Sequence, residues 1–557
     1  MKSSTIHNNE ASSLLLQGGR VVDVTAGRML EADVLIRNGR IERIGRPLSD
    51  RADTTIDCRG RVITAGFVDT HVHIESSMVL PQAFGEAVLP HGTTTVIADP
   101  HEAVNVGGAS ALDVFLEEAR LSPADVFTVV PSSVPATPFD TNGAGEFTAD
   151  EMKPYVCHDD VVGLGEVMCF VDVKNKRKEI LDKINLFKDK TIDGHTAGMP
   201  EEWVEEYAAA GVKNDHECVS AEALLHRYAC GMNIYVREGS AARNARELLT
   251  AVKAHGLDTK RFAFCTDDKH LATIAREGHI SYIVRMALAM GFSWPEVALM
   301  ASDNACRFYG LKDRGRMAEG YRADIVVTDA DCRHIDWVIK DGRIVAQNQS
   351  VLSDVSHHKE VRQFANTVKF RTLSPEDFTL PDRLRHMALV LTEGQLLTKL
   401  KHLEGDAWRN LPLLATIERH GRNGNMAVCL LEGYGIRGGA VATSVSHDSH
   451  NVVCAGDNPE DMALATNTLR DMGGGYVVAS GGRVLASLAL PAFGLMATGD
   501  AHSVAERISQ LETAAHQLGV NPGIDPFITL SFVALPVIPS VRLLDTGLFL
   551  TDTQEFL

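Results

Sequence analysis

The chain has 557 residues, and its 54 Lys and Arg against 73 Asp and Glu give a formal net charge of −19. This acidic balance argues against a nucleic-acid-binding protein, because binding to a phosphate backbone depends on clustered Lys and Arg. Hydrophobic residues make up 45% of the chain, which is ample material for globular cores. The longest apolar run, residues 485–497, is too short for a membrane span and contains Pro491.

The N-terminal segment and the cysteines predict a cytoplasmic protein. The first residues, MKSSTIHNNEASS, lack a basic segment followed by an apolar core, so we expect no secretory signal. The ten cysteines are scattered and form no C-x-x-C pair, which argues against a structural zinc site and against a disulfide framework.

Short strands rich in Val and Ile are predicted at both flanks of a central region. Residues 13–65 contain such runs, with turn signals at Gly18-Gly19 and Asn38-Gly39. Similar runs rich in Val and Ile occur at residues 323–346, where Asp341-Gly342 is a hairpin turn signal. These two pieces predict one flanking β-sandwich, made of residues 1–65 and 318–370 around an inserted domain.

Between the flanks, residues 66–317 alternate apolar β-branched runs with intervals of helix length. We expect eight strands, at residues 67–72, 94–99, 126–131, 161–166, 190–194, 212–216, 232–236 and 262–267. Eight strands separated by helices fit a (β/α)₈ TIM-like barrel. Residues 371–557 have a new pattern of strand-like runs, with a helix-like run near residues 502–519, and predict a separate C-terminal α/β domain.

The strongest local signal for chemistry is His71-Val72-His73, which follows the first predicted barrel strand. Side chains alternate along a strand, so residues two apart point the same way. The two imidazoles can therefore bind one metal ion.

Polar residues also end other predicted strands, where barrel enzymes place their active sites. They are Asp99-Pro100-His101-Glu102, Gly165-Glu166, Asp193-Gly194-His195, Asp215-His216-Glu217, Arg237-Glu238-Gly239 and Thr266-Asp267-Asp268. Each one alone fits an ordinary hydrogen-bonded polar group. Together, four histidines and two carboxylates at strand ends predict a metal site.

The chain resembles the amidohydrolase superfamily in its GFVDTHVH start, its later single histidines, its strand-eight Asp and its ADIVV…IKDGRIV segment. Within that superfamily it is similar to the adenine deaminases, over essentially residues 13–545. The motifs that carry this similarity are HVHIESS (71–77), ADPHEAVNVGG (98–108), GLGEVM (163–168), DGHTAG (193–198), NDHECV (214–219), CTDDKH (265–270) and SVSHDSHNVVCAGDN (444–458).

The resemblance implies two divalent metal ions per chain. His71, His73 and Asp267 would hold one ion, and His195 and His216 the other, with Glu166 as the bridge. Many relatives bridge with a carbamylated Lys, but residues 163–168 contain no Lys. Oxygen and imidazole ligands suit Mn²⁺, Fe²⁺ or Zn²⁺, and the resemblance favours manganese or iron.

Such a site makes hydroxide available near neutral pH, which in an aminopurine would attack C6. Asp267 is then the candidate general base and later general acid, because it can take the proton of water and pass it to the leaving amine. Candidates for purine recognition are Asp268, Glu75, His101 and Glu102, each of which could instead only support the site from behind.

The motif around His447, Asp448 and His450 has three interpretations. These side chains could reach the barrel mouth, bind a further metal, or form an internal hydrogen-bonded loop.

The expected activity is the hydrolytic deamination of adenine to hypoxanthine and ammonia, a purine salvage reaction with a purine base and water as the partners. One alternative is a cyclic amidohydrolase that acts on an amide ring, as dihydroorotase does. The other is a non-catalytic relative that has lost the metal. A homo-oligomer is expected, with a dimer favoured.

Overall fold

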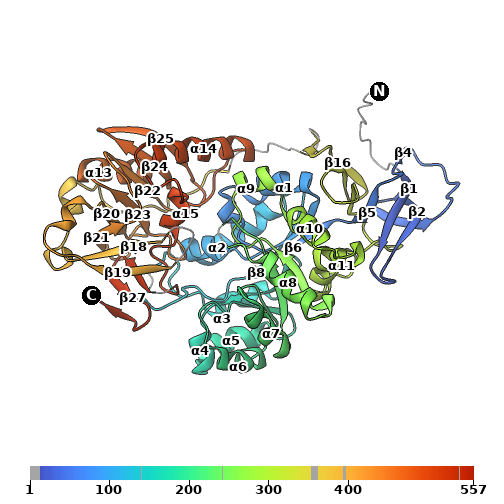
Figure 1. Cartoon of the computed structure of the whole chain (residues 1–557), viewed down its shortest axis with the longest axis horizontal. Coiled ribbons are helices and arrows are strands. Elements are labelled where there is room, and N and C mark those ends of the chain that lie inside the picture. Colours follow the sequence, from blue (N-terminus) through green and yellow to red (C-terminus); the bar gives the residue numbers. More distant parts are fainter. Residues whose placement is uncertain are drawn as a thin grey trace.

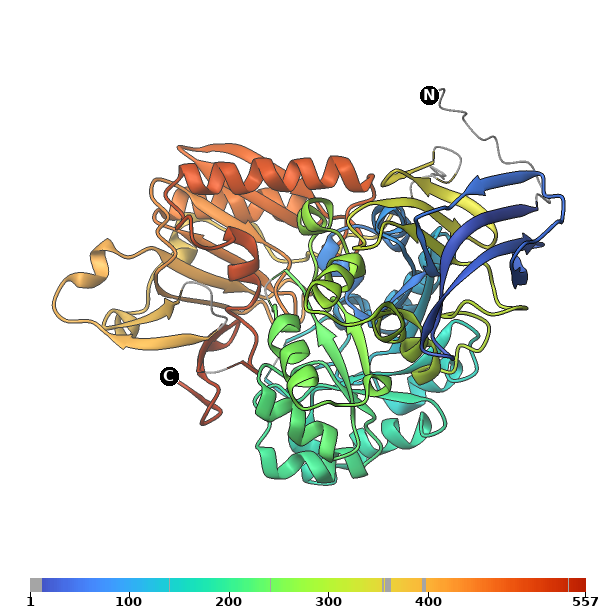
Figure 2. The same ribbon diagram turned by 45° about the vertical axis from the view of Figure 1, so that its right-hand side comes forward.

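The computed structural model describes residues 13–139, 141–240, 242–352, 355, 362–392, 397–538 and 540–557. Three units lie in a row: a sheet unit at one end, a barrel in the middle and a C-terminal unit at the other end (Figure 1, Figure 2). Residues 1–12, the start of the expected first flank, lie outside the described residues. Within the described part of the chain, no helix is both long and apolar enough to cross a membrane.

The central unit is a ring of eight parallel strands, which confirms the predicted (β/α)₈ barrel. The strands are β6 (Phe67–Val72), β7 (Thr93–Ala98), β8 (Asp125–Val130), β9 (Val161–Val167), β10 (Thr191–Gly194), β11 (Asn214–Asp215), β12 (Asn233–Arg237) and β13 (Phe262–Cys265). Strands β6 to β10 form one sheet and β11 to β13 another. The ring closes where the N–H of Asp267 donates to the carbonyl of His71 over 3.0 Å and the N–H of Lys213 to the carbonyl of Ile192 over 3.0 Å.

Helices cover the outside of the ring, so the strands are buried on both faces. Strands β6, β7 and β9 are buried at every residue, which is why they read as continuous apolar runs rather than alternating ones. The longer barrel helices are α1 (Pro81–Val88), α2 (His101–Ala119), α5 (Lys178–Leu186), α7 (Ala221–Ala229), α8 (Ala245–Ala254) and α10 (Ile280–Ala289). This arrangement leaves the carboxyl ends of the strands at one face of the barrel, where the loops can carry a site.

The sheet unit is built from both sides of the barrel segment. Its described strands are β1 (Leu14–Asp23), β2 (Arg28–Arg37), β3 (Arg40–Gly45), β4 (Thr54–Asp57), β5 (Val62–Ala65), β14 (Ile325–Thr328), β15 (Ile335–Lys340), β16 (Arg343–Gln347) and β17 (Ser350–Val351). Antiparallel pairing of β5 with β14 joins the two halves. Residues of both halves, including Leu16, Val34, Ile325 and Ile339, share one hydrophobic core.

The C-terminal unit has an eight-strand sheet with helices, which confirms the predicted α/β fold. Its strands are β18 (Met387–Leu391), β19 (Thr398–His402), β20 (Leu413–Ile417), β21 (Met426–Glu432), β22 (Ala440–Thr443), β23 (Val452–Gly456), β24 (Gly475–Ser480) and β25 (Arg483–Ala489), and its helices are α13 (Pro459–Asp471), α14 (Ala501–Gln517) and α15 (Pro526–Ser531). Helix α14 packs against barrel helices α1 and α9 (Leu271–Glu277). A parallel bridge between Val79 and Ala497 adds a second link to the barrel.

Candidate active site

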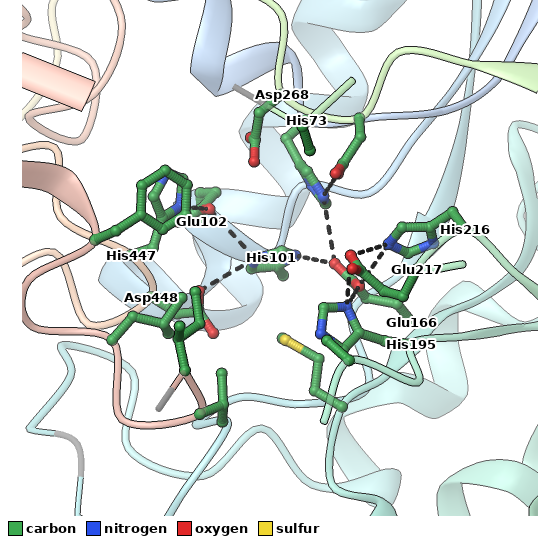
Figure 3. A pocket seen from close by; sticks show the side chains of 18 of the residues that line it. His73, His101, Glu102, Glu166, His195, His216, Glu217, Asp268, His447 and Asp448 are labelled. Carbon is green, nitrogen blue, oxygen red and sulfur yellow. Dashed lines mark hydrogen bonds and ion pairs between the residues drawn. The ribbon is translucent and has the colours of Figure 1, made fainter. Parts of the chain in front are cut away.

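A cavity lies at the carboxyl ends of the barrel strands, and the C-terminal unit forms its opposite wall (Figure 3). The barrel contributes five of the six predicted metal ligands, which are His73, Glu166, His195, His216 and Asp267. The C-terminal unit contributes His447, Asp448, Phe532, Leu535, Val537 and Ile538. The cavity is therefore complete only when both units are in place.

The six residues predicted as metal ligands lie together at this cavity, which all of them except His71 line, and they are called here the dinuclear cluster: His71, His73, Glu166, His195, His216 and Asp267. The two histidines of the first strand point the same way, because His71 Nε2 lies 3.2 Å from His73 Nε2. The rings of His71 and His216 stack with their centroids 4.2 Å apart. Strands β6 and β11, which lie far apart in the sequence, therefore place their ligands in contact.

Glu166 lies between two sets of histidines (Figure 3). Its Oε1 is 3.3 Å from His73 Nε2. Its Oε2 is 2.6 Å from His195 Nδ1 and 3.3 Å from His216 Nε2. One carboxylate thus presents each oxygen to a different set, which is the geometry a bridging ligand requires.

The segment around Glu166 is shaped by Asp99, which directly follows strand β7. The N–H of Glu166 donates to Asp99 Oδ2 over 2.9 Å. A side chain at Gly165 would begin 2.3 Å from that same oxygen, so this position requires glycine. The GLGE sequence therefore lets Asp99 approach the backbone and fix the direction of Glu166.

Asp267 is aimed by the turn that follows strand β13. Its backbone has φ +58°, a left-handed conformation that is uncommon for a residue with a side chain. The preceding Thr266 is held by Asp69, whose Oδ1 accepts the Thr266 N–H over 3.0 Å. Asp267 Oδ1 then lies 3.1 Å from His73 Nε2. The buried Asp69 thus positions Asp267 from behind the site.

The hydrogen bond behind His73 determines which of its ring nitrogens can bind a metal. His73 Nδ1 lies 2.9 Å from the carbonyl oxygen of Asp99. A carbonyl oxygen can only accept, so Nδ1 carries a proton, and Nε2, which lies beside Glu166 and Asp267, is the nitrogen that can bind a metal. A histidine held in this way is a typical metal ligand, and the residues fit a divalent cation.

The buried carboxylates of this cluster are held in the charged form. Burial alone would raise the pKa of Glu166, but its contacts with His195, His216 and His73 hold the pKa well below its usual range. Burial likewise opposes the charge on Asp267, and hydrogen bonds with His71 and His73 together with the nearby Arg237 hold its pKa low. Two adjacent buried carboxylates that stay ionised suit a site for cations.

Two residues that we did not predict as site residues complete the electrostatics of the cavity. Arg237 donates from Nη1 to Asp267 Oδ2 over 2.8 Å and from Nη2 to Glu217 Oε2 over 2.9 Å. Glu217 Oε1 also lies 3.3 Å from His216 Nε2. Both residues follow predicted barrel strands, so their position is a signal, but nothing in the sequence pairs them with each other.

The four predicted substrate-binding residues occupy different places. Asp268, His101 and Glu102 line the cavity. Glu75 is absent from the described residues that line it, and its Oε1 accepts the N–H of Ala103 over 3.1 Å in the first turn of α2. Glu75 thus supports the helix that carries His101 and Glu102.

Comparison with known proteins identifies the family of this chain. Residues 62–348 match the Amidohydrolase family, and residues 391–555 match the Adenine deaminase C-terminal domain. An adenine deaminase of Desulfitobacterium hafniense (strain Y51) is 38% identical over 558 residues, which cover 98% of this chain and 96% of the relative. One of Nitratidesulfovibrio vulgaris (strain DP4) is 41% identical over 560 residues, with the same coverage. The chain belongs to the adenine deaminase family of amidohydrolases.

Among solved structures, a β-aspartyl dipeptidase from Fervidobacterium islandicum AW-1 is similar with a TM-score of 0.48 and 14% identity. The aligned region covers 62% of this chain and 99% of the dipeptidase chain.

The segment matched to the adenine deaminase C-terminal domain reaches into the barrel mouth through the loop between β22 and β23. There His447 Nδ1 contacts Glu102 Oε1, and His450 Nε2 contacts Glu102 Oε2. We call Glu102, His447 and His450 the interdomain cluster. All three are buried, and their geometry could accommodate a metal ion.

The hydrogen bond behind His450 argues against a metal in the interdomain cluster. The N–H of Ser446 donates to His450 Nδ1 over 3.1 Å. A neutral ring that accepts at Nδ1 has its proton on Nε2, so His450 donates to Glu102 and has no lone pair for a metal. Burial lowers the pKa of His450 despite the opposing effect of Glu102, and the positive charges of His447 and of the fully buried Arg419 lower it further. The cluster therefore holds its charge balance without a cation.

Proposed function

We propose that this chain catalyses the hydrolytic deamination of adenine to hypoxanthine and ammonia at a centre of two divalent metal ions. Membership of the adenine deaminase family supports the reaction. The observation that carries the dinuclear centre is the position of Glu166, whose two oxygens each face a different set of histidines.

In this proposal His71, His73 and Asp267 hold one metal ion, His195 and His216 hold the other, and Glu166 bridges them. Imidazole nitrogens and carboxylate oxygens suit Mn²⁺ or Fe²⁺, with Zn²⁺ a further candidate. When bound, the two cations would lower the pKa of a water molecule and so supply hydroxide near neutral pH.

Asp267 moves the protons of the reaction. Its Oδ2 is held by Arg237, while Oδ1 faces the histidines of the first strand. An ionised carboxylate fixed at one oxygen can take a proton from water and then deliver it to the leaving amine. Asp268, His101 and Glu102 line the cavity where the purine ring would lie and are the candidates for contact with its nitrogens.

The experiment that tests the function is ammonia release from adenine by the full-length protein loaded with Mn²⁺, with adenosine and dihydroorotate beside it. We expect rapid release from adenine only. Hydrolysis of dihydroorotate without turnover of adenine would instead establish an amide-ring hydrolase. A protein that binds two metals and turns over none of the three would contradict the proposal.

We also propose that the protein acts in purine salvage as a cytoplasmic homodimer. The family membership is the support for the pathway, and the dimer follows only from the frequency of symmetric oligomers among enzymes. Light scattering of the metal-loaded protein tests the dimer.

A further inference from the structure

Asp448 is a buried carboxylate in the cavity wall that the proposed reaction leaves without a role. Asp448 is 3% exposed, and its Oδ2 has no hydrogen-bond partner among the described residues. Its Oδ1 lies 3.7 Å from His101 Nε2. A buried polar atom without a partner is costly, so this oxygen is expected to meet a hydrogen-bond donor that is not part of the chain.

Asp448 faces the dinuclear cluster from the far side of the cavity. The His101 ring lies between Asp448 and Glu166, with Nε2 toward Asp448 and Nδ1 3.4 Å from Glu166 Oε1 (Figure 3). A ligand that lies alongside the His101 ring, with its reacting atom at Glu166, has its opposite edge near Asp448. The barrel supplies the reacting end of the cavity, and the C-terminal unit supplies the other end.

The walls near Asp448 suit a flat apolar ring. Phe532, Leu535, Val537 and Ile538 line this side of the cavity. The ring of His447 stacks on Phe532 with centroids 4.7 Å apart and planes 24° apart. Apolar walls with few polar groups are typical of sites that orient a heterocycle through a small number of hydrogen bonds.

The loop that carries Asp448 is fixed from both sides. His447 and His450 flank it in the sequence, and both contact the carboxylate of Glu102 on the barrel. The orientation of His450 is fixed in turn by its hydrogen bond from Ser446. These contacts of His447 and His450 with Glu102 span the two units, and we call them the clamp that holds Asp448 in place.

We propose that Asp448 binds the imidazole N–H of the substrate and so selects the free purine base over 9-substituted purines. The assignment rests on the proposed function, because that function places C6 and its amino group at the dinuclear cluster. Adenine then has only one other N–H, on its imidazole ring, and a carboxylate can only accept. A purine substituted at N9 lacks this donor and leaves Asp448 unpaired. A site with a buried hydrogen-bond acceptor discriminates strongly against a ligand that lacks the matching donor.

The test compares adenine with 9-methyladenine in the full-length enzyme loaded with Mn²⁺, as the wild type and as Asp448→Ala and Asp448→Asn. In the wild type we expect kcat/KM for 9-methyladenine to be lower by about 10²-fold or more. Asp448→Ala should lower kcat/KM for adenine by about 10- to 100-fold, mainly through KM. The ratio of kcat/KM for adenine to kcat/KM for 9-methyladenine should fall at least tenfold toward unity. Asp448→Asn keeps an acceptor oxygen and should recover part of the loss.

Asp552→Ala is the matched control, because Asp552 is an exposed acidic residue of the same unit and its loss should not change the ratio. Calorimetry with hypoxanthine and 9-methylhypoxanthine gives a second readout that does not depend on turnover, and the wild type should bind the unsubstituted product more tightly. If Asp448→Ala does not fold, the kinetic comparison and the calorimetry are both made with the isosteric Asp448→Asn.

The outcomes separate the two proposals. A wild type that releases no ammonia from adenine overturns both. Turnover of adenine with an unchanged substrate ratio in Asp448→Ala and Asp448→Asn overturns the role of Asp448 alone. Three metal ions per chain in the wild type and two in Glu102→Gln would make the interdomain cluster a metal site, and would overturn the clamp that holds Asp448.

Discussion

The dinuclear cluster and the interdomain cluster have similar composition and lie at the same barrel mouth, but His73 of the first and His450 of the second are oriented in opposite ways. His73 donates from its outer nitrogen to the Asp99 carbonyl, so its inner nitrogen is the one that can bind a metal. His450 accepts at its outer nitrogen from the Ser446 N–H, so its inner nitrogen presents a proton. For these two histidines, the partner of the outer nitrogen therefore distinguishes a candidate metal ligand from a hydrogen-bond donor, although the residue types do not.

The two clusters also differ in the number of carboxylates. The dinuclear cluster combines two ionised carboxylates with four histidines, a set of donors that suits cations. The interdomain cluster has one carboxylate, Glu102, and burial alone would lower the pKa of His447, but Glu102 outweighs it and raises that pKa to about 9. A protonated His447 already balances Glu102. Only the first cluster should therefore lose function when the metal is removed.

The largest effect is expected from Glu166→Gln, which keeps the volume of the side chain and removes the bridging charge. We expect the second metal ion to be lost and turnover to fall on the order of 10⁴-fold, since residues that act as a unit lose nearly all activity together. Metal analysis and ammonia release measure the two effects.

Glu102→Gln is the matched control for that variant, because it makes the same change in the interdomain cluster. It should retain two metal ions per chain. Two metals and a near-normal rate in Glu166→Gln would remove Glu166 from the bridging position.

Asp267→Asn tests the proton transfer. We expect a folded protein with kcat lower by about 10²- to 10⁴-fold, because an amide can neither take the proton of water nor return one to the amine. Circular dichroism checks the fold, and ammonia release measures kcat. Unchanged turnover would place the proton shuttle on another residue.

Much of the dinuclear cluster can be predicted from the sequence because its residues end separate barrel strands. The strand period puts His71 and His73 on one side, and the barrel fold brings Glu166 and Asp267 to the same face. Local patterns therefore determine global positions here. The eight predicted strands agree with the structure because parallel barrel strands read as short apolar runs.

The interdomain cluster could not be predicted in the same way. Glu102 and His447 are 345 residues apart, and their contact depends on how the C-terminal unit packs on the barrel. No periodicity encodes that packing. The pairing of Arg237 with Glu217 has the same cause, because it depends on side-chain directions at the ends of two strands rather than on a motif.

A smaller effect is expected from the clamp. His450→Ala should raise KM for adenine by about tenfold, because Glu102 loses one of its donors and the Asp448 loop is held less firmly. Metal content and kcat should change little. His450→Gln can still donate an N–H and should recover part of the loss. A fall in metal content in His450→Ala would show that this residue belongs with the metal ligands.

The smallest effect concerns pH and the stability of the contact between the units. His447 has an ordinary pKa of 6.5 and a raised one of about 9 in the fold. The groups that face it are Glu102, Asp268, Asp448, His270 and His450. Because the pKa of His447 is raised in the fold, protonated His447 contributes to the free energy of unfolding. This contribution is fully present below pH 6.5, declines above it and is lost above about pH 9.

His447→Gln should therefore lower the midpoint of thermal unfolding by a few degrees near pH 6, which corresponds to about 3 kcal/mol, and by nothing near pH 10. The difference between wild type and variant is the quantity to compare, because other groups also titrate over this range and cancel in it. A difference that does not change with pH would mean that His447 is neutral in the fold. The interdomain cluster would then depend on hydrogen bonds alone, and the contrast in charge balance with the dinuclear cluster would be lost.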